Sequence, residues 1–115
     1  MTTTNDIDSF FKPALENLHS PFLMDGMDTA LGRIEKAIAE GEHIRIYGDY
    51  DVDGTVTTAM LTRYLRRIGA QVDYYIPKRF TEFYGLSIET VEECYNDGIS
   101  LLITVDTGVT AIDAI

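Results

Sequence analysis

Residues 44–55 read IRIYGDYDVDGT, and the change of pattern within this stretch decides the fold class. The largely apolar residues 44–47 are typical of a buried β-strand. An acidic turn flanked by glycines follows at 48–54, and residues 55–68 carry apolar side chains at helical spacing. A strand that leads through a turn into an amphipathic helix is typical of an α/β protein.

The same alternation continues on both sides of this stretch. We expect helices at 25–40, 55–68 and 87–96, with another from residue 110. We expect strands at 44–47, 72–76 and 101–105. Apolar strands that alternate with amphipathic helices predict a Rossmann-like parallel sheet with helices on both faces. The inward face of helix 55–68 is expected to consist of Val56, Ala59, Met60, Tyr64, Leu65 and Ile68.

The chain is expected to divide into an N-terminal arm at 1–24 and one α/β unit at 25–115. Phe10, Phe11, Leu15 and Leu18 recur at near-helical spacing in the arm, which we expect to dock on another surface. The last residues begin an amphipathic helix without a stop signal, and three strands are few for such a sheet. We therefore expect the 115 residues to be a piece of a longer protein.

The formal net charge of -10 disfavours a generic phosphate-binding surface, because nucleic-acid-binding proteins usually have a basic face. Either the protein does not bind nucleic acid, or its acidic residues hold cations and the basic surface lies elsewhere. No autonomous nucleic-acid binding is expected of these residues. The single cysteine, Cys94, excludes an intrachain disulfide, and neither a signal peptide nor a membrane-spanning window occurs. These features predict a cytoplasmic protein with no membrane partner.

Asp49, Asp51 and Asp53 stand two residues apart after the strand, a spacing that points them to one side of an extended chain. Three carboxylates held together repel one another unless a cation lies among them. Their hard oxygen atoms suit Mg²⁺ or Mn²⁺, and ligands of open α/β sheets bind beyond the carboxyl ends of the strands. Gly54 and Thr55 are expected to open the next helix, whose N-terminal amides favour a phosphate.

Two further groups are predicted at the same edge of the sheet. Asp106 follows the apolar strand 101–105 and is a candidate fourth carboxylate that bridges two metal ions, or simply a helix cap. Lys78 and Arg79 follow the strand before it and are candidate phosphate ligands. The nearby aromatic residues Phe80, Phe83 and Tyr84 suit base stacking, although the pattern alone favours an ordinary surface loop.

The acidic turn has three other interpretations. The simplest is a solvated surface turn, since Asp and Gly are common turn residues. An EF-hand loop fails, because the twelfth residue counted from Asp49 is Met60 rather than glutamate. A haloacid-dehalogenase-type phosphatase remains an alternative, with Asp51 as nucleophile and Asp53 as general acid. That reading gives Asp49 no role.

Four segments carry a resemblance to a known family. They are residues 19–23 with 27–28, residues 47–54, residues 75–80 with 84–87, and residues 103–108. In order and spacing these segments resemble the DHH phosphoesterases in their RecJ form, from about residue 19 to the end. Such a set of motifs is more specific than any one of them.

The resemblance implies that Asp51, Asp53 and Asp106 are divalent-metal ligands, with Asp49 in or beside the site. It implies a phosphodiesterase that degrades single-stranded DNA from the 5′ end in repair and recombination, with two Mn²⁺ or Mg²⁺ ions in the complete enzyme. Single-stranded DNA would be bound through the full-length protein. Within the family, an enzyme for short oligonucleotides, cyclic dinucleotides or pyrophosphate is the alternative, and a non-enzymatic metal-binding module is another.

The sequence departs from the family pattern in three respects. The Asp-His-His segment that names the family does not occur, so we expect the DHH domain to be truncated before it and the 115 residues to be inactive alone. Phe83 stands where RecJ proteins usually have glycine. Thr107 stands where cysteine is common.

Overall fold

The computed structural model describes residues 11–12, 14–78 and 85–108. The chain divides into two units, Met1–Gly32 and Arg33–Ile115. The first unit contains two short 3-10 helices, η1 (Leu15–Asn17) and η2 (Pro21–Leu23), and the start of helix α2 (Met27–Glu40). Its large apolar side chains are exposed: Phe11, Leu15, Leu18, Phe22, Leu23 and Met24.

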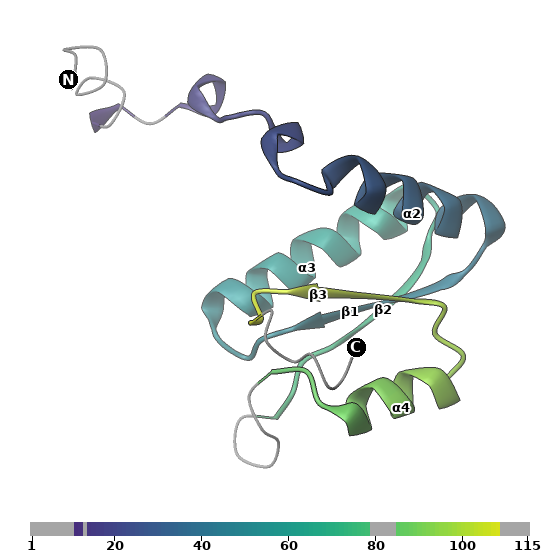
Figure 1. Cartoon of the computed structure of the whole chain (residues 1–115). Helices are drawn as coiled ribbons and strands as arrows, with labels where there is room; N and C mark the ends of the chain where they lie inside the picture. The colour runs from purple at the N-terminus through teal and green to yellow at the C-terminus, as the bar shows by residue number, and fades with distance from the viewer. Residues whose placement is uncertain (1–10, 13, 79–84, 109–115) are drawn as a thin grey trace. The chain divides into compact units, whose positions relative to one another are not determined.

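The second unit is built on a parallel sheet of three strands (Figure 1). The strands are β1 (His43–Gly48), β2 (Gln71–Tyr75) and β3 (Leu101–Val105), and their order is β2-β1-β3. Helix α3 (Val52–Arg67) covers one face and helix α4 (Ile88–Asn96) the other. The predicted parallel α/β architecture is therefore confirmed. In the part of the chain that the structure describes, no helix is long and apolar enough to cross a membrane.

The hydrophobic core lies between the sheet and the helices on the α3 side. Ile44 and Ile46 of the central strand are fully buried, and Val72 lies beside Ile44 in the register of β1 with β2. Ala37 of α2 and Leu65 of α3 complete the buried cluster. Alternate residues of the central strand thus fill the core, as the period of a β-strand requires.

The prediction for the inward face of α3 was wrong for most of its residues. Val56, Met60 and Tyr64 are exposed, and so are Ala59 and Ile68. The buried positions of the helix are Gly54, Thr58, Thr62 and Leu65. The helix approaches the end of β1 so closely that a side chain on Gly48 would meet the hydroxyl of Thr58. Small side chains fit between α3 and β1 at this short distance. The face of α3 that carries Thr58 and Thr62 therefore points inward, and its apolar face points outward.

The helix ends mostly follow the residues predicted for them. Ser87 caps α4, and its hydroxyl accepts a hydrogen bond of 3.2 Å from the Thr90 amide. Gly41 ends α2 with a φ of 67°, a left-handed conformation that glycine adopts without a steric penalty. Helix α3 begins at Val52, three residues earlier than expected, because Asp51 caps it. The helix expected from residue 110 lies outside the described residues.

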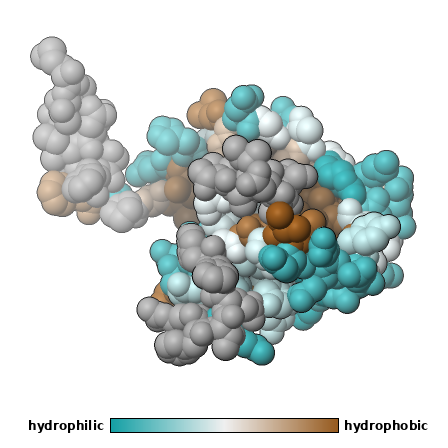
Figure 2. Space-filling view, turned by 60° about the horizontal axis from the view of Figure 1, so that its bottom comes forward, coloured by the Kyte–Doolittle hydropathy of each residue, from teal (hydrophilic) through white to brown (hydrophobic). Residues whose placement is uncertain are grey.

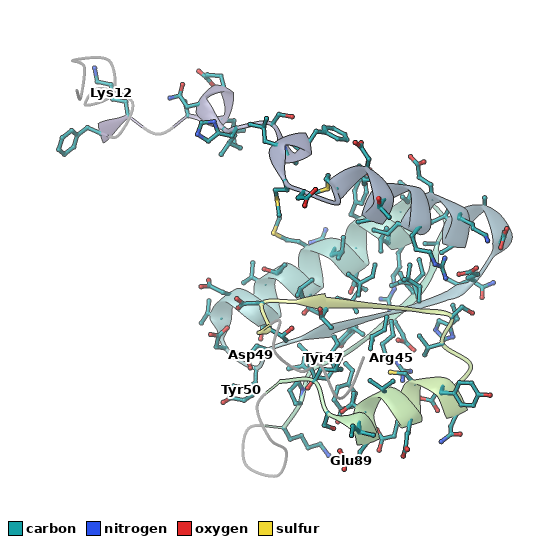
Figure 3. The ribbon with its side chains drawn as sticks, in the orientation of Figure 1. Lys12, Arg45, Tyr47, Asp49, Tyr50 and Glu89 are labelled. Carbon is teal, nitrogen blue, oxygen red and sulfur yellow. The ribbon has the colours of Figure 1, made fainter. Side chains whose placement is uncertain are left out.

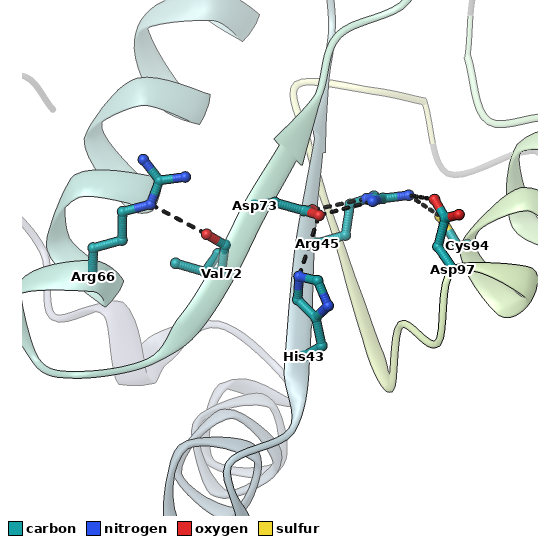
Figure 4. A network of polar contacts seen from close by, with 7 residues as sticks. All are labelled: His43, Arg45, Arg66, Val72, Asp73, Cys94 and Asp97. Carbon is teal, nitrogen blue, oxygen red and sulfur yellow. Dashed lines mark hydrogen bonds and ion pairs between the residues drawn. The ribbon is translucent and has the colours of Figure 1, made fainter.

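An ion-pair network joins the sheet to α4 on the face opposite α3 (Figure 4). The Arg45 guanidinium donates to both carboxylate oxygens of Asp73, each at 2.8 Å, and to Asp97 Oδ2 at 2.7 Å. His43 Nε2 lies 3.2 Å from Asp73 Oδ2. The hydrogen bonds to Asp73 raise the pKa of Arg45 above its usual range. One side chain of β1 thereby links β2 to Asp97, the residue that follows α4.

Replacing Arg45 with methionine is expected to lower the free energy of unfolding by about 2 kcal/mol, because Asp73 and Asp97 lose their common partner. The loss is smaller than for a fully buried pair, since both carboxylates are partly exposed. Arg45→Lys keeps the positive charge but not the paired hydrogen bonds, so its free energy of unfolding should lie between those of the wild type and of Arg45→Met. Urea unfolding followed by circular dichroism measures the difference; equal stability of all three proteins would contradict the role of the network.

Acid is expected to destabilise this network through Asp73. The hydrogen bonds from Arg45 lower the pKa of Asp73. A carboxyl whose pKa is lowered on folding stabilises the protein above its unfolded pKa, about 3.9, and the contribution is lost as pH falls further. The unfolding free energy of the wild type should therefore fall more steeply below about pH 4 than that of Asp73→Asn. Parallel curves for the two proteins would show that Asp73 carries no such contribution.

Candidate metal centre

The carboxyl ends of β1 and β3 bring the two predicted acidic motifs together. Gly48, the last residue of β1, is the register partner of Val105, the last residue of β3. Asp49 and Asp106 directly follow these two residues, so the two motifs leave the sheet at the same edge. The predicted placement of Asp106 beside the turn that holds Asp51 and Asp53 is confirmed by this register.

Asp51 starts helix α3. Its Oδ1 accepts a hydrogen bond of 2.9 Å from the Gly54 amide, and its carbonyl accepts one of 3.0 Å from the Thr55 amide. The positive end of the helix dipole therefore lies beside the carboxylate cluster and partly offsets its charge. Both amides that were predicted to bind phosphate already have acceptors in Asp51. The phosphate-binding role of Gly54 and Thr55 stays a prediction.

The charges of the cluster act on Asp106. Its pKa is raised first by desolvation, although the side chain is exposed, and then by the charges of Asp51 and Asp53. A hydrogen bond with Asp51 and the charge of Asp49 add to the effect. All four carboxylates therefore share one electrostatic environment. Like charges so arranged favour either a proton or a cation between them.

The backbone of Asp106 is itself unusual. Its φ is 54°, in the left-handed region, and among the described residues other than glycine no second one has a positive φ. Aspartate and asparagine tolerate this conformation better than most residues, but it still costs free energy. Backbone strain of this kind is often found at functional sites.

Asp49 is much less exposed to solvent than the other three carboxylates. It is only 6% exposed, whereas Asp51, Asp53 and Asp106 are exposed. Its Oδ1 accepts a hydrogen bond of 2.6 Å from the Tyr50 amide, and both residues lie where β1 ends (Figure 3). Asp49 therefore holds the turn in shape beside the exposed carboxylates.

Two glycines permit this turn, and sequence reasoning missed their role. A side-chain carbon on Gly54 would come within 2.5 Å of the Asp49 carbonyl oxygen and 2.7 Å of its nitrogen. The first turn of α3 therefore packs directly on the backbone of Asp49. A side chain on Gly48 would meet Thr58. The glycines at both ends of the acidic segment are the feature of the sequence from which this role could have been predicted.

The donor set fits a hard divalent cation, because it consists of carboxylate oxygens alone. Within residues 11–12, 14–78 and 85–108, no three His, Cys, Asp or Glu side chains form a ready-made metal-binding group. The carboxylates lie at one edge of the sheet and share one electrostatic environment, but they would have to move closer to one another to bind an ion. Asp51, Asp53 and Asp106 are the exposed members that could do so.

The basic residues predicted for this edge are placed only in part. Lys78 is exposed and lies three residues beyond the end of β2. Arg79 and the aromatic residues Phe80, Phe83 and Tyr84 lie outside the described residues. The Tyr47 hydroxyl donates to the Gly85 carbonyl at 2.8 Å, so the first described residue after this segment contacts the sheet.

Replacing Asp106 with asparagine is expected to raise the unfolding temperature of the metal-free protein at neutral pH. The change removes one repelling charge, and asparagine also tolerates a positive φ. Added Mn²⁺ should raise the unfolding temperature of the wild type but not of Asp106→Asn. Asp106→Ala removes the same charge but strains the backbone, so it should unfold below Asp106→Asn. Thermal unfolding with Mn²⁺ or EDTA measures all three, and identical responses to Mn²⁺ would contradict this assignment.

These features define a class of protein: a parallel α/β domain with carboxylates gathered at the carboxyl edge of its sheet. The model of the DHH family, N-terminal domain, matches residues 43–115, and the chain belongs to this family. The predicted family is thereby confirmed, and the dehalogenase-type alternative is not favoured.

Several relatives are described as the single-stranded-DNA-specific exonuclease RecJ. The protein of Bacillus subtilis is 46% identical over 96 residues, which are 84% of this chain and 12% of that protein. The protein of Thermus thermophilus is 40% identical over 98 residues, which are 83% of this chain and 15% of that protein.

Two solved structures share the fold. A crystal structure of exonuclease RecJ bound to manganese has a TM-score of 0.71 and 41% identity, and covers 76% of this chain and 22% of that chain. RecJ of Thermus thermophilus in complex with Mn²⁺ has a TM-score of 0.66 and 36% identity, and covers 85% of this chain and 13% of that chain. This chain thus spans less than a quarter of each of these relatives.

Proposed function

We propose that this chain supplies two carboxylate motifs to a metal-dependent phosphodiesterase of the RecJ type, which degrades single-stranded DNA. The observation that carries the proposal is the convergence of Asp51, Asp53 and Asp106 at one edge of the sheet. The names of the relatives support the substrate, and their manganese-bound structures support Mn²⁺ or Mg²⁺ as the cofactor. The division into an arm at 1–24 and part of a DHH domain at 25–115 belongs to the same proposal, as does a cytoplasmic location.

A pair of bound divalent ions would lower the pKa of a water molecule, orient it and stabilise the leaving oxygen. Asp51, Asp53 and Asp106 would hold such ions through their exposed carboxylates. Asp49 would keep the turn in position through its hydrogen bond with the Tyr50 amide. Lys78, which is exposed beyond β2, would pair with a phosphate of the substrate.

Asp51 would have two roles at once. One of its oxygens caps α3 through the Gly54 amide, and a carboxylate has further lone pairs for a metal ion. The hydrogen bond fixes the orientation of the carboxylate before an ion arrives. Such outer contacts commonly strengthen metal binding.

Within the family, an enzyme for short oligonucleotides, cyclic dinucleotides or pyrophosphate is the second candidate. The relatives described above support long single-stranded DNA instead. A comparison of hydrolysis rates on a labelled single strand and on dinucleotides separates the two candidates. Faster turnover of dinucleotides would favour the second.

A chimera tests the proposed function on the residues of this chain. The matching segment of the Bacillus subtilis relative would be replaced by this chain, to which it is 46% identical. The chimera is expected to degrade 5′-labelled single-stranded DNA when Mn²⁺ is present, whereas the 115 residues alone are expected to be inactive. A folded chimera that binds Mn²⁺ without degrading DNA would contradict the proposal, as would activity that survives Asp51→Ala.

A further inference from the structure

The outer face of α3 carries an exposed apolar stripe. Val56, Met60 and Tyr64 follow one another at intervals of four residues and therefore lie on one side of the helix. Their exposed fractions are 50%, 68% and 61%. Ala59 is exposed beside them. Contiguous exposed apolar side chains of this kind commonly mark a protein-binding surface.

Arginines border this stripe toward the end of the helix. They are Arg63, Arg66 and Arg67, three of the nine basic residues in a chain whose net charge is -10. The dipole of the helix favours basic residues there, but it does not give them a carboxylate partner. Among the described residues the ion pairs are made by other cations, and Arg66 donates instead to the Val72 carbonyl at 3.2 Å.

The surface around these arginines is hollowed. A cavity of about 250 Å³ lies between α3 and β2, and its lining includes Thr58, Thr62, Arg63, Arg66 and Ile76. The hydroxyls of Thr58 and Thr62 are buried and have no hydrogen-bond partner among the described residues. A second hollow is lined by Val56, Ala59, Met60 and Arg63, so that Arg63 borders both. The first cavity is smaller than the pockets of about 300–1,000 Å³ that hold small ligands, and it suits one inserted side chain.

We propose that the outer face of α3 binds an acidic amphipathic helix of a partner protein. The aliphatic side chains of the partner would lie on Val56 and Met60, with one of them inserted in the cavity beside Ile76. Its Asp or Glu residues would pair with Arg63 and Arg67. Apolar anchors at helical spacing with charged flanks are the usual way in which a helix is recognised by a groove.

The chemistry of the face favours this partner over two others. Single-stranded nucleic acid binds through several aromatic rings on which bases stack, whereas the stripe has one aromatic ring, that of Tyr64, beside the non-aromatic Val56, Ala59 and Met60. A second copy joined through the same face would set Arg63 and Arg67 against the same arginines, with no carboxylates to pair with them. In its described part, the side turned forward in Figure 2 is mostly hydrophilic, with a hydrophobic patch near its centre.

The test uses the 115-residue protein and a fluorescent designed helix of about five turns, with leucines on one face and glutamates on its flanks. Fluorescence anisotropy is expected to show saturable binding, weakened about tenfold when the glutamates of the peptide become glutamines. Arg63→Glu and Met60→Asp are each expected to weaken binding of the acidic peptide by about tenfold or more. Lys36→Glu reverses a charge on α2 and should leave binding unchanged.

Several outcomes would overturn the assignment. These are no saturable binding, equal binding of the glutamine peptide, or equal binding by Arg63→Glu and the wild type. Binding of oligo-dT that depends on Arg63 would assign the face to nucleic acid instead. Self-association lost in Arg63→Glu would assign it to a second copy. All substituted residues except Lys36 lie on the outer face of α3, and circular dichroism confirms that each variant is folded.

Discussion

Replacing Asp51 with asparagine is expected to abolish Mn²⁺ binding while leaving the fold intact. Asparagine retains an oxygen that accepts the hydrogen bond from the Gly54 amide, so the cap of α3 is kept. It lacks the negative charge that a hard divalent cation requires. The affinity for Mn²⁺ in isothermal titration should fall about 100-fold or more. In the chimera, hydrolysis of single-stranded DNA should fall to background.

Asp51→Ala separates the two roles of this residue. Alanine loses both the charge and the cap, so the variant should also lose about 1 kcal/mol of stability. Asp51→Asn and Asp51→Ala are therefore expected to lose Mn²⁺ binding equally, whereas Asp51→Ala should lose more stability. Wild-type affinity in Asp51→Asn would remove Asp51 from the metal site, and equal destabilisation by both substitutions would remove its role as a cap.

Replacing Gly54 with alanine is expected to disrupt the turn that holds the carboxylates. The new side-chain carbon would lie 2.5–2.8 Å from three backbone atoms of Asp49, which cannot move as a flexible side chain could. We expect a loss of about 3 kcal/mol or more in the free energy of unfolding, or no folded protein at all. Metal binding should be lost together with the fold.

Gly32 provides the matched control for this substitution. It lies within α2, where a side-chain carbon would meet nothing within 4 Å. Alanine there should stabilise the protein by roughly 0.5–1 kcal/mol, because it favours the helix more than glycine does. Chemical unfolding of both variants measures the contrast. A Gly54→Ala protein as stable as the wild type would contradict the close packing of α3 on Asp49.

The order of the elements and the parallel sheet could be predicted from the sequence. The apolar segments 44–47, 72–76 and 101–105 are separated by amphipathic stretches, and in a parallel sheet the residues after each strand must meet at one edge. The sequence therefore predicts that Asp106 lies near Asp51 and Asp53. The shared edge follows from the parallel direction of the strands, so it can be predicted without knowledge of side-chain packing.

The face that α3 buries could not be predicted in this way. Periodicity favoured its apolar residues, but the side of the helix that turns inward depends on how closely it approaches β1. That approach depends on Gly48 and Gly54, whose missing side chains leave room only for small neighbours such as Thr58. An apolar stripe therefore remains exposed on α3. The positive φ of Asp106 was also not predictable, since it arises from the turn after β3.

The most direct test of the metal centre is the anomalous scattering of manganese in a crystal of this protein grown with Mn²⁺. One or more ions are expected at coordination distance from carboxylate oxygens of Asp51, Asp53 and Asp106. An ordered manganese ion elsewhere on the protein, with these three carboxylates still facing water, would contradict the proposed site.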